Sequence, residues 1–280
     1  ADRVYPIGGI NPRPPLFSWS LAIGAMILQP FLGEDAVWWS MLALPAIYGA
    51  LTILPVAAIA RDHFGKAAGV IAAWLIAFMP AHVTHSTWGL ADHDSFVMLF
   101  IAIGFMFYLR AVKYAGSERL VRTTSIRPLD MLRAMGAVAQ ERQYAMANAV
   151  LAGVAFGAAS LGWKGFVVGP AILFLAYAAQ VALNMFRRRD STILSTLFLT
   201  MLLTNLLIAL PFYAHPQMNL MLDGSGLQPF LFILLFTVVM MYITTGFRDK
   251  PWLLVLGTLA VGAVAFLGAL WVLKYFNLSN

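Results

Sequence analysis

The sequence contains no cysteine and few charged residues. Of its 280 residues, 11% are charged and 61% are hydrophobic, whereas a soluble domain would carry about 25% charged residues. The absence of cysteine excludes disulfides, thiol catalysis and Cys-based zinc or iron–sulfur sites. The charges also fall between long apolar runs instead of alternating with them. This pattern excludes an ordinary soluble domain.

The apolar runs indicate a protein embedded in a lipid bilayer. The mean hydropathy is +0.81, and a charge at the middle of a bilayer costs about 2.5–3.5 kcal/mol on insertion scales. The net charge is +6. Such basicity could indicate a nucleic-acid partner, but in a membrane protein it reflects the excess of Lys and Arg in cytoplasmic loops. We therefore expect the bilayer as a partner, and no nucleic acid.

Crossing a bilayer takes about 20 predominantly apolar residues, and runs of this kind recur along the chain. We expect an all-α, polytopic membrane protein with about eight spans. The predicted spans are Ala36–Ala60, Ala67–Val83, Ser95–Leu109, Ala145–Gly162, Gly165–Phe186, Thr192–Tyr213, Leu227–Gly246 and Trp252–Leu273. Leu16–Leu32 is apolar but interrupted by polar residues, so it could either span the bilayer or lie at its interface.

Residues 116–144 form the one extended polar region. Leu129, Leu132, Met135 and Ala139 recur there at helical spacing, which predicts an amphipathic helix along the membrane surface. No linker or repeat indicates a second domain. We treat 1–280 as one transmembrane domain that includes this loop.

The basic residues predict the orientation. Lys and Arg concentrate at 61–66, 110–142, 187–189 and 248–250. Two spans separate each successive pair of these groups, so all four lie on one side. That side is the cytoplasm by the positive-inside rule. The intervening turns, among them Thr84–Asp94 and Trp163-Lys164, are therefore expected to face outward.

One of these turns concentrates the groups that could carry chemistry. Thr84–Phe96 holds Asp92, Asp94, His85 and His93 within a dozen residues. Two carboxylates two residues apart at a helix start can both face one cation, and Mg²⁺ or Mn²⁺ prefers oxygen ligands. The helix N-terminus would also attract phosphate. The alternative is that one Asp caps the helix and the other is merely solvated.

The neighbouring candidates have ordinary explanations too. His85 and His93 could hydrogen-bond phosphate or complete a metal shell, or could be interfacial histidines without function. Trp163 and Lys164 place an aromatic ring and a cation in the next outward turn, where an anionic group could dock. They could equally be an interfacial tryptophan and a snorkelling lysine.

Three motifs resemble the membrane domain of the oligosaccharyltransferase catalytic subunit, most closely that of archaeal members. The first is Tyr5-Pro6 followed by Arg13–Phe17, which resembles the first outer loop of that family. Thr87–Asp94 resembles its second acidic motif, and Leu161–Phe166 resembles a Trp-Gly-Gly-aromatic turn found two spans later. The resemblance covers about residues 5 to 190. It implies that 1–35 form an outer loop with an interfacial helix at Leu16–Leu32.

The resemblance also implies a function. It predicts a metal-dependent glycosyltransferase that moves an oligosaccharide from a polyprenyl (pyro)phosphate carrier to Asn of an N-x-S/T acceptor in a polypeptide. Asp92 and Asp94 would be the catalytic residues and the ligands of Mg²⁺ or Mn²⁺, and His85, His93, Trp163 and Lys164 would bind substrate. The protein would lie in the plasma membrane of an archaeon, with its active site on the extracytoplasmic face.

The chain departs from the family pattern in several places. The family often has Arg where His85 stands, and no convincing counterpart exists for its first acidic motif, its outer-loop glutamate or its Trp-Trp-Asp acceptor motif. The chain is therefore expected to be either a fragment that omits the soluble acceptor-binding domain or a diverged member of the family, and we favour the fragment. Two other functions remain open: another multi-pass lipid-linked-sugar transferase, and a cation- or proton-coupled transporter. A non-catalytic scaffold subunit is a further alternative.

Overall fold

The computed structural model describes residues 14–116, 127–187, 189–214 and 227–246, and a few positions between 256 and 263. These residues form helices and no strand, so the all-α class is confirmed. The elements are α1 (Leu16–Leu32), η1 (Gly33–Asp35), α2 (Ala36–Phe64), α3 (Lys66–Phe78), α4 (Pro80–His85), α5 (Asp94–Ala115), α6 (Pro128–Glu141), α7 (Gln143–Ser160), η2 (Lys164–Val167), α8 (Val168–Phe186), α9 (Thr192–Tyr213) and α10 (Leu227–Gly246). Most of the predicted span Trp252–Leu273 lies outside the described residues.

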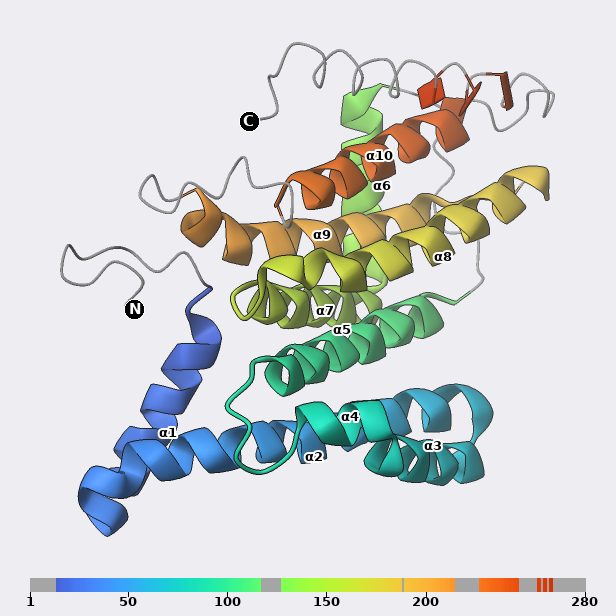
Figure 1. The fold of residues 1–280 in the computed structure, drawn as a ribbon. Helices are drawn as coiled ribbons and strands as arrows, with labels where there is room; N and C mark the ends of the chain where they lie inside the picture. The colour runs from blue at the N-terminus through green and yellow to red at the C-terminus, as the bar shows by residue number, and fades with distance from the viewer. Residues whose placement is uncertain are drawn as a thin grey trace.

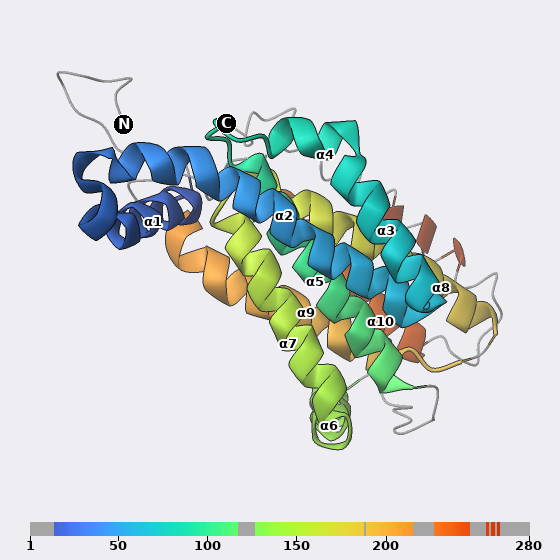
Figure 2. The same ribbon diagram turned by 90° about the horizontal axis from the view of Figure 1, so that it is seen from below.

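Helices α2, α5, α7, α8, α9 and α10 run alongside one another, whereas α1 lies across one end of this bundle and α6 across the other (Figures 1 and 2). The α4–α5 loop and the α7–η2 turn lie at the α1 end. The ends of α2 and α5 that carry basic residues lie at the opposite end. The polar α4–α5 loop and the basic ends of α2 and α5 thus lie at opposite ends of the bundle, as predicted, whereas the basic groups at 117–126 and 248–250 lie outside the described residues.

Five stretches among the described residues are long and apolar enough to cross a membrane. They are Leu16–Phe64, Asp94–Ala115, Lys164–Phe186, Thr192–Tyr213 and Leu227–Thr245. The first joins α1 to α2, and α1 exposes large apolar side chains such as Met26 and Phe31. The count of eight spans stays a prediction, as does the interfacial position of α1.

Close helix packing around α7 builds the core. Gly153 faces Thr204 and Met201 of α9, and a Cβ there would lie 2.5 Å from Thr204. The ring of Phe156 fills the space beside Gly104 of α5, where a Cβ would lie 2.8 Å from the ring. Small residues at such positions let helix backbones approach closely in membrane bundles. This packing holds α5 beside α7, and the start of α5 carries the candidate carboxylates.

Two predictions about the region from α2 to α4 are wrong. The single helix predicted over Ala67–Val83 is broken at Met79, which is extended with ψ 117°. Pro80 causes the break because a proline disfavours helical geometry in the residue before it and then starts a new helix well. The predicted spans Ala36–Ala60 and Ala67–Val83 leave 61–66 as a polar loop between them, and this loop is also wrong: α2 continues to Phe64, and Gly65 alone, with φ +94°, makes the turn.

The amphipathic helix predicted in the polar region exists as α6, but its buried face differs from the apolar face that the sequence suggests. Met131, Ala134 and Val138 are buried against the protein, whereas Leu129 and Leu132 are exposed. The buried face follows from the position of α6 against α7 and α9, which local spacing does not reveal. A membrane contact by Leu129 and Leu132 stays a prediction.

Candidate functional site

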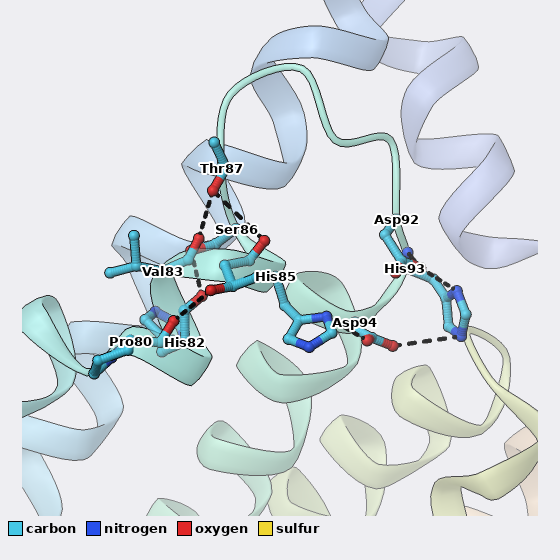
Figure 3. A network of polar contacts seen from close by, with 10 residues as sticks. Pro80, His82, Val83, His85, Ser86, Thr87, Asp92, His93 and Asp94 are labelled. Carbon is cyan, nitrogen blue, oxygen red and sulfur yellow. Dashed lines mark hydrogen bonds and ion pairs between the residues drawn. The ribbon is translucent and has the colours of Figure 1, made fainter.

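The stretch Thr84–Phe96 connects α4 to α5 at the end of the bundle where α1 lies. Hydroxyl groups close the last turn of α4: Ser86 Oγ donates to the His82 carbonyl at 2.8 Å, and Thr87 Oγ1 donates to the Val83 carbonyl at 2.7 Å (Figure 3). These bonds satisfy carbonyl groups that a helix end leaves without partners. As a result α4 ends in a defined position at His85.

The loop after α4 is docked on α2. The Gly89 N–H donates to the Leu42 carbonyl at 3.2 Å, and Gly89 has φ +93°, a conformation that favours glycine. Trp88 packs edge-on against Trp39 with 5.9 Å between ring centroids. Trp88 therefore contributes to positioning the loop, in addition to any role in an interfacial aromatic belt.

Both carboxylates face imidazole rings. His85 Nδ1 lies 2.9 Å from Asp94 Oδ2, and His93 Nδ1 lies 2.8 Å from Asp92 Oδ1. The other nitrogen of His93 is directed toward Asp94, with 3.7 Å between Nε2 and Oδ1 (Figure 3). The four residues that the sequence concentrates in this loop thus form one polar cluster.

Three of these residues have the arrangement of a metal-ligand set. His85, Asp92 and Asp94 each offer one ligand atom, and these atoms lie within 4.8 Å of one another. Their side chains are 55%, 35% and 39% exposed, so water or substrate can supply further ligands. Two carboxylates suit hard divalent ions, and an imidazole is a common additional ligand. The donor set fits a divalent metal.

The alternative role of helix capping is not observed. No side-chain oxygen caps α5, and its first turn contains Asp94 as the one acidic residue. Asp92 Oδ1 instead accepts the N–H of His93 at 2.7 Å. Both carboxylates are therefore directed at the cluster and not at the first free N–H groups of the helix.

The α7–η2 turn lies beside this cluster. The rings of Trp163 and His93 are 6.4 Å apart between centroids, and Phe17 of α1 contacts His93 edge-on at the same distance. The Leu16 N–H donates to the Leu161 carbonyl at 2.8 Å, which ties α1 to this turn. Two segments about 70 residues apart in sequence, at 93 and 163, thus meet at one site.

Trp163 and Lys164 hold different positions in this turn. A Cβ at Gly165 would lie 2.3 Å from the Trp163 indole, so the ring occupies the space that a side chain at position 165 would take. Lys164 begins η2 and is half-buried. The structure therefore brings Trp163 to the cluster directly and places Lys164 next to it in sequence.

Sequence reasoning missed three positioning residues. His82 Nε2 lies 3.1 Å from the Gly49 carbonyl oxygen, and a Cβ at Gly49 would lie 2.3 Å from Ser86 Cβ. The sequence places Phe17 in the motif Arg13–Phe17 but does not predict its contact with His93. A glycine inside the apolar run of α2 carries no local signal of this role, because the segment it touches lies 33 or more residues away.

Comparisons with known proteins identify relatives. The model of the family "Oligosaccharyl transferase STT3, N-terminal" matches residues 3–276. Dolichyl-phosphooligosaccharide-protein glycotransferase 3 of Archaeoglobus fulgidus is 32% identical over 213 residues, which cover 74% of this chain and 22% of that protein. The chain thus spans about a fifth of the length of this relative.

Solved structures of an A. fulgidus oligosaccharyltransferase share the fold. One, tethered to an acceptor peptide with the NVT sequon, has a TM-score of 0.71 at 23% identity and covers 96% of this chain and 31% of that one. The AglB complex with an inhibitory peptide and a dolichol-phosphate has a TM-score of 0.70 at 22% identity, over 96% and 30%. A complex with Zn and sulfate has 0.65 at 23%, over 97% and 32%. These matches confirm a polytopic helical membrane fold.

Proposed function

The chain belongs to the oligosaccharyl transferase STT3 family, and on that premise we propose that it is the membrane-embedded part of an oligosaccharyltransferase. The enzyme transfers an oligosaccharide from a polyprenyl (pyro)phosphate carrier to the Asn of an N-x-S/T acceptor in a polypeptide. The observation that carries the proposal is the cluster of Asp92, Asp94 and His85, whose ligand atoms lie within 4.8 Å of one another at one end of the bundle.

A divalent metal belongs to this proposal. Asp92 and Asp94 would hold Mg²⁺ or Mn²⁺, with His85 as a third ligand. A bound divalent ion would stabilise the charge on the departing phosphate and help to orient the acceptor amide. The partial exposure of all three side chains leaves room for phosphate oxygens and water in the remaining positions.

Side chains around the metal-ligand set would bind the donor. His93 lies between the two carboxylates and is held by the rings of Phe17 and Trp163, so its orientation is restricted before substrate arrives. Trp163 is 39% exposed and offers a flat apolar surface beside the polar cluster. Lys164, in the same turn, adds a cation for the phosphate of the carrier. His85 and His93 can donate N–H groups to the same phosphate.

The two other open functions receive less support. A coupled transporter needs ionisable residues near the middle of the bilayer, whereas the acidic residues of this cluster lie at a helix start at one end of the bundle. Another lipid-linked-sugar transferase would use the same metal site, but the family model that matches this chain is that of an oligosaccharyl transferase. The A. fulgidus relatives, one with an NVT acceptor peptide and one with dolichol-phosphate, support transfer to Asn from a lipid carrier.

The location of the active site follows from the distribution of basic residues. We place the cluster on the extracytoplasmic face of an archaeal plasma membrane, because the connections rich in Lys and Arg lie at the opposite end of the bundle. A cysteine introduced at Thr87, which is exposed beside the site, would react with an impermeant thiol reagent added outside intact cells. Labelling only after lysis would contradict this placement.

The decisive experiment combines activity with metal binding. Asp92→Asn and Asp94→Asn are expected to abolish metal-dependent formation of glycopeptide from a lipid-linked donor and to weaken Mn²⁺ binding, measured by electron paramagnetic resonance. Asp130→Asn is the matched control, because Asp130 lies on α6 and pairs with Arg133. Full activity in both site variants would refute the proposed function.

A further inference from the structure

A basic cluster lies at the end of α2 and α5 farthest from the site described above. Asp62 of α2 is at its centre. Arg110 Nε of α5 donates to Asp62 Oδ2 at 2.7 Å, and Arg61 donates to Oδ1 from both Nε and a terminal nitrogen at 3.0 and 2.9 Å. Lys113 Nζ donates to the backbone carbonyl of Asp62.

The cations of this cluster outnumber its one carboxylate. Lys66 begins α3, directly after the turn at Gly65, and is exposed. Arg61 and Lys113 are exposed as well, and Asp62 is 17% exposed on its side chain. Asp62 is the only acidic partner of these cations among the described residues. Among the described residues, Arg61, Lys66, Arg110 and Lys113 therefore share one carboxylate, which leaves this part of the surface with an excess of positive charge.

The backbone beneath the cluster is tightly constrained. A Cβ at Gly69 of α3 would lie 2.8 Å from Arg61 Cβ and 3.0 Å from the Ala57 carbonyl oxygen. The helices α2 and α3 therefore pack closely as far as the turn that joins them. This packing restricts the backbone that carries Arg61 and Lys66. The Arg110–Asp62 ion pair fixes α5 to the same support.

Exposed apolar side chains border the cations. Phe64 is 81% exposed, Tyr114 is 56% exposed and Val112 is 37% exposed. Phe64 follows the basic turn on α2, and the other two flank Lys113 on α5. Exposed apolar side chains next to cations have the chemistry of a bilayer edge, where hydrocarbon chains meet phosphate groups.

We propose that Arg61, Lys66 and Lys113 bind the phosphate headgroup of an anionic membrane lipid at the end of the bundle opposite the metal-ligand cluster. The hydrocarbon chains of this lipid lie against Phe64, Val112 and Tyr114. A free phosphate or a nucleic acid would use the cations but not the apolar border. This lipid site is independent of the proposed transferase function.

The test measures lipid binding to the purified protein in detergent by native mass spectrometry. Phosphatidylglycerol and phosphatidylcholine with identical acyl chains are the two probes, and glycerol 3-phosphate is the soluble headgroup probe. We expect phosphatidylglycerol to be retained over phosphatidylcholine. Arg61→Gln with Lys66→Gln should lower the affinity for phosphatidylglycerol by about tenfold, because each surface cation contributes to the attraction of an anionic lipid.

The variants for this lipid-binding test are chosen to keep the fold intact. The double variant preserves the Arg110–Asp62 ion pair, and Arg133→Gln on α6 is the matched control because Arg133 is 70% exposed and lies on another element. Circular dichroism and gel filtration check that each variant folds. Equal retention of both lipids, undiminished binding in the double variant, or equal loss in the Arg133 control would each overturn the proposal. Binding of glycerol 3-phosphate as strong as that of the lipid would do the same.

Discussion

His82 on α4 contacts the backbone of Gly49 on α2, with 3.1 Å between its Nε2 and the Gly49 carbonyl oxygen. On the same side of α4, a Cβ at Gly49 would lie 2.3 Å from Ser86 Cβ. The absence of a side chain at position 49 therefore lets the end of α4 approach α2. This approach sets the position of His85 opposite Asp94.

Gly49→Ala is expected to push α4 away from α2. Overpacking of this kind costs about 1–3 kcal/mol in stability, and the displaced His85 should weaken Mn²⁺ binding as well. Thermal unfolding and Mn²⁺ titration measure the two effects. Gly136→Ala on α6 is the control, since among the described residues nothing beyond the neighbouring backbone of α6 itself lies within 4 Å of its Cβ position and replacing glycine inside a helix stabilises by about 0.5–1 kcal/mol. Unchanged Mn²⁺ affinity in Gly49→Ala would show that this contact does not position the site.

His85→Ala tests whether the imidazole is a metal ligand. We expect Mn²⁺ affinity to fall on the order of tenfold or more, since even the loss of an outer-shell partner has an effect of this size. His63→Ala is the matched control, because His63 is an exposed histidine in the last turn of α2. An unchanged affinity in His85→Ala would restrict the ligand set to Asp92 and Asp94.

Gly165→Ala is expected to displace the Trp163 ring, which lies 2.3 Å from the position of the new Cβ. The ring would lose its contact with His93. If Trp163 binds the donor, the KM for the lipid-linked donor rises while kcat changes little, since the metal-ligand set is untouched. Steady-state kinetics with varied donor measure this effect. A fall in kcat at constant KM would mean that the turn acts on the reacting groups and not on donor binding.

Asn205→Leu is expected to stabilise the protein. Asn205 on α9 is 1% exposed, and neither polar atom of its amide has a hydrogen-bond partner among the described residues. A buried polar group without a partner costs about 1–3 kcal/mol, so the melting temperature should rise. Thr204→Val is the control, because Thr204 Oγ1 already donates to the Thr200 carbonyl at 2.9 Å. A lower melting temperature in Asn205→Leu would indicate that the amide is hydrogen-bonded in the membrane.

Apolar runs and turn residues allowed most helices of the fold to be predicted. The observed bounds of α9 and α10 equal the predicted ones, because each run is long and contains no charged residue. The predicted helix bounds were wrong where a single residue changes the local backbone geometry. Pro80 divided a predicted span, and the helical geometry of Arg61–Phe64 survived in a polar segment because the turn needs only Gly65.

The candidate site was predicted as a set of residues but not as an arrangement. The D-x-D spacing and the outward turns pointed to Asp92, Asp94, His93 and Trp163. The position of Phe17 against His93, and the support of α4 by Gly49, depend on contacts between segments far apart in the chain. Local periodicity contains no information about such contacts. The role of each site residue stays a prediction until the variants above are measured.

The sequence alone determined the class of this protein, because hydrophobic length and the scarcity of charge leave helices in a bilayer as the solution that satisfies every backbone group. It also determined that Asp92, His93 and Asp94 lie at a helix start. Only the tertiary structure decided that His85 faces Asp94 and that Trp163 meets His93. The physical reason is that these neighbours are set by how α2, α4, α5 and α7 pack, and packing depends on side chains from all of them at once.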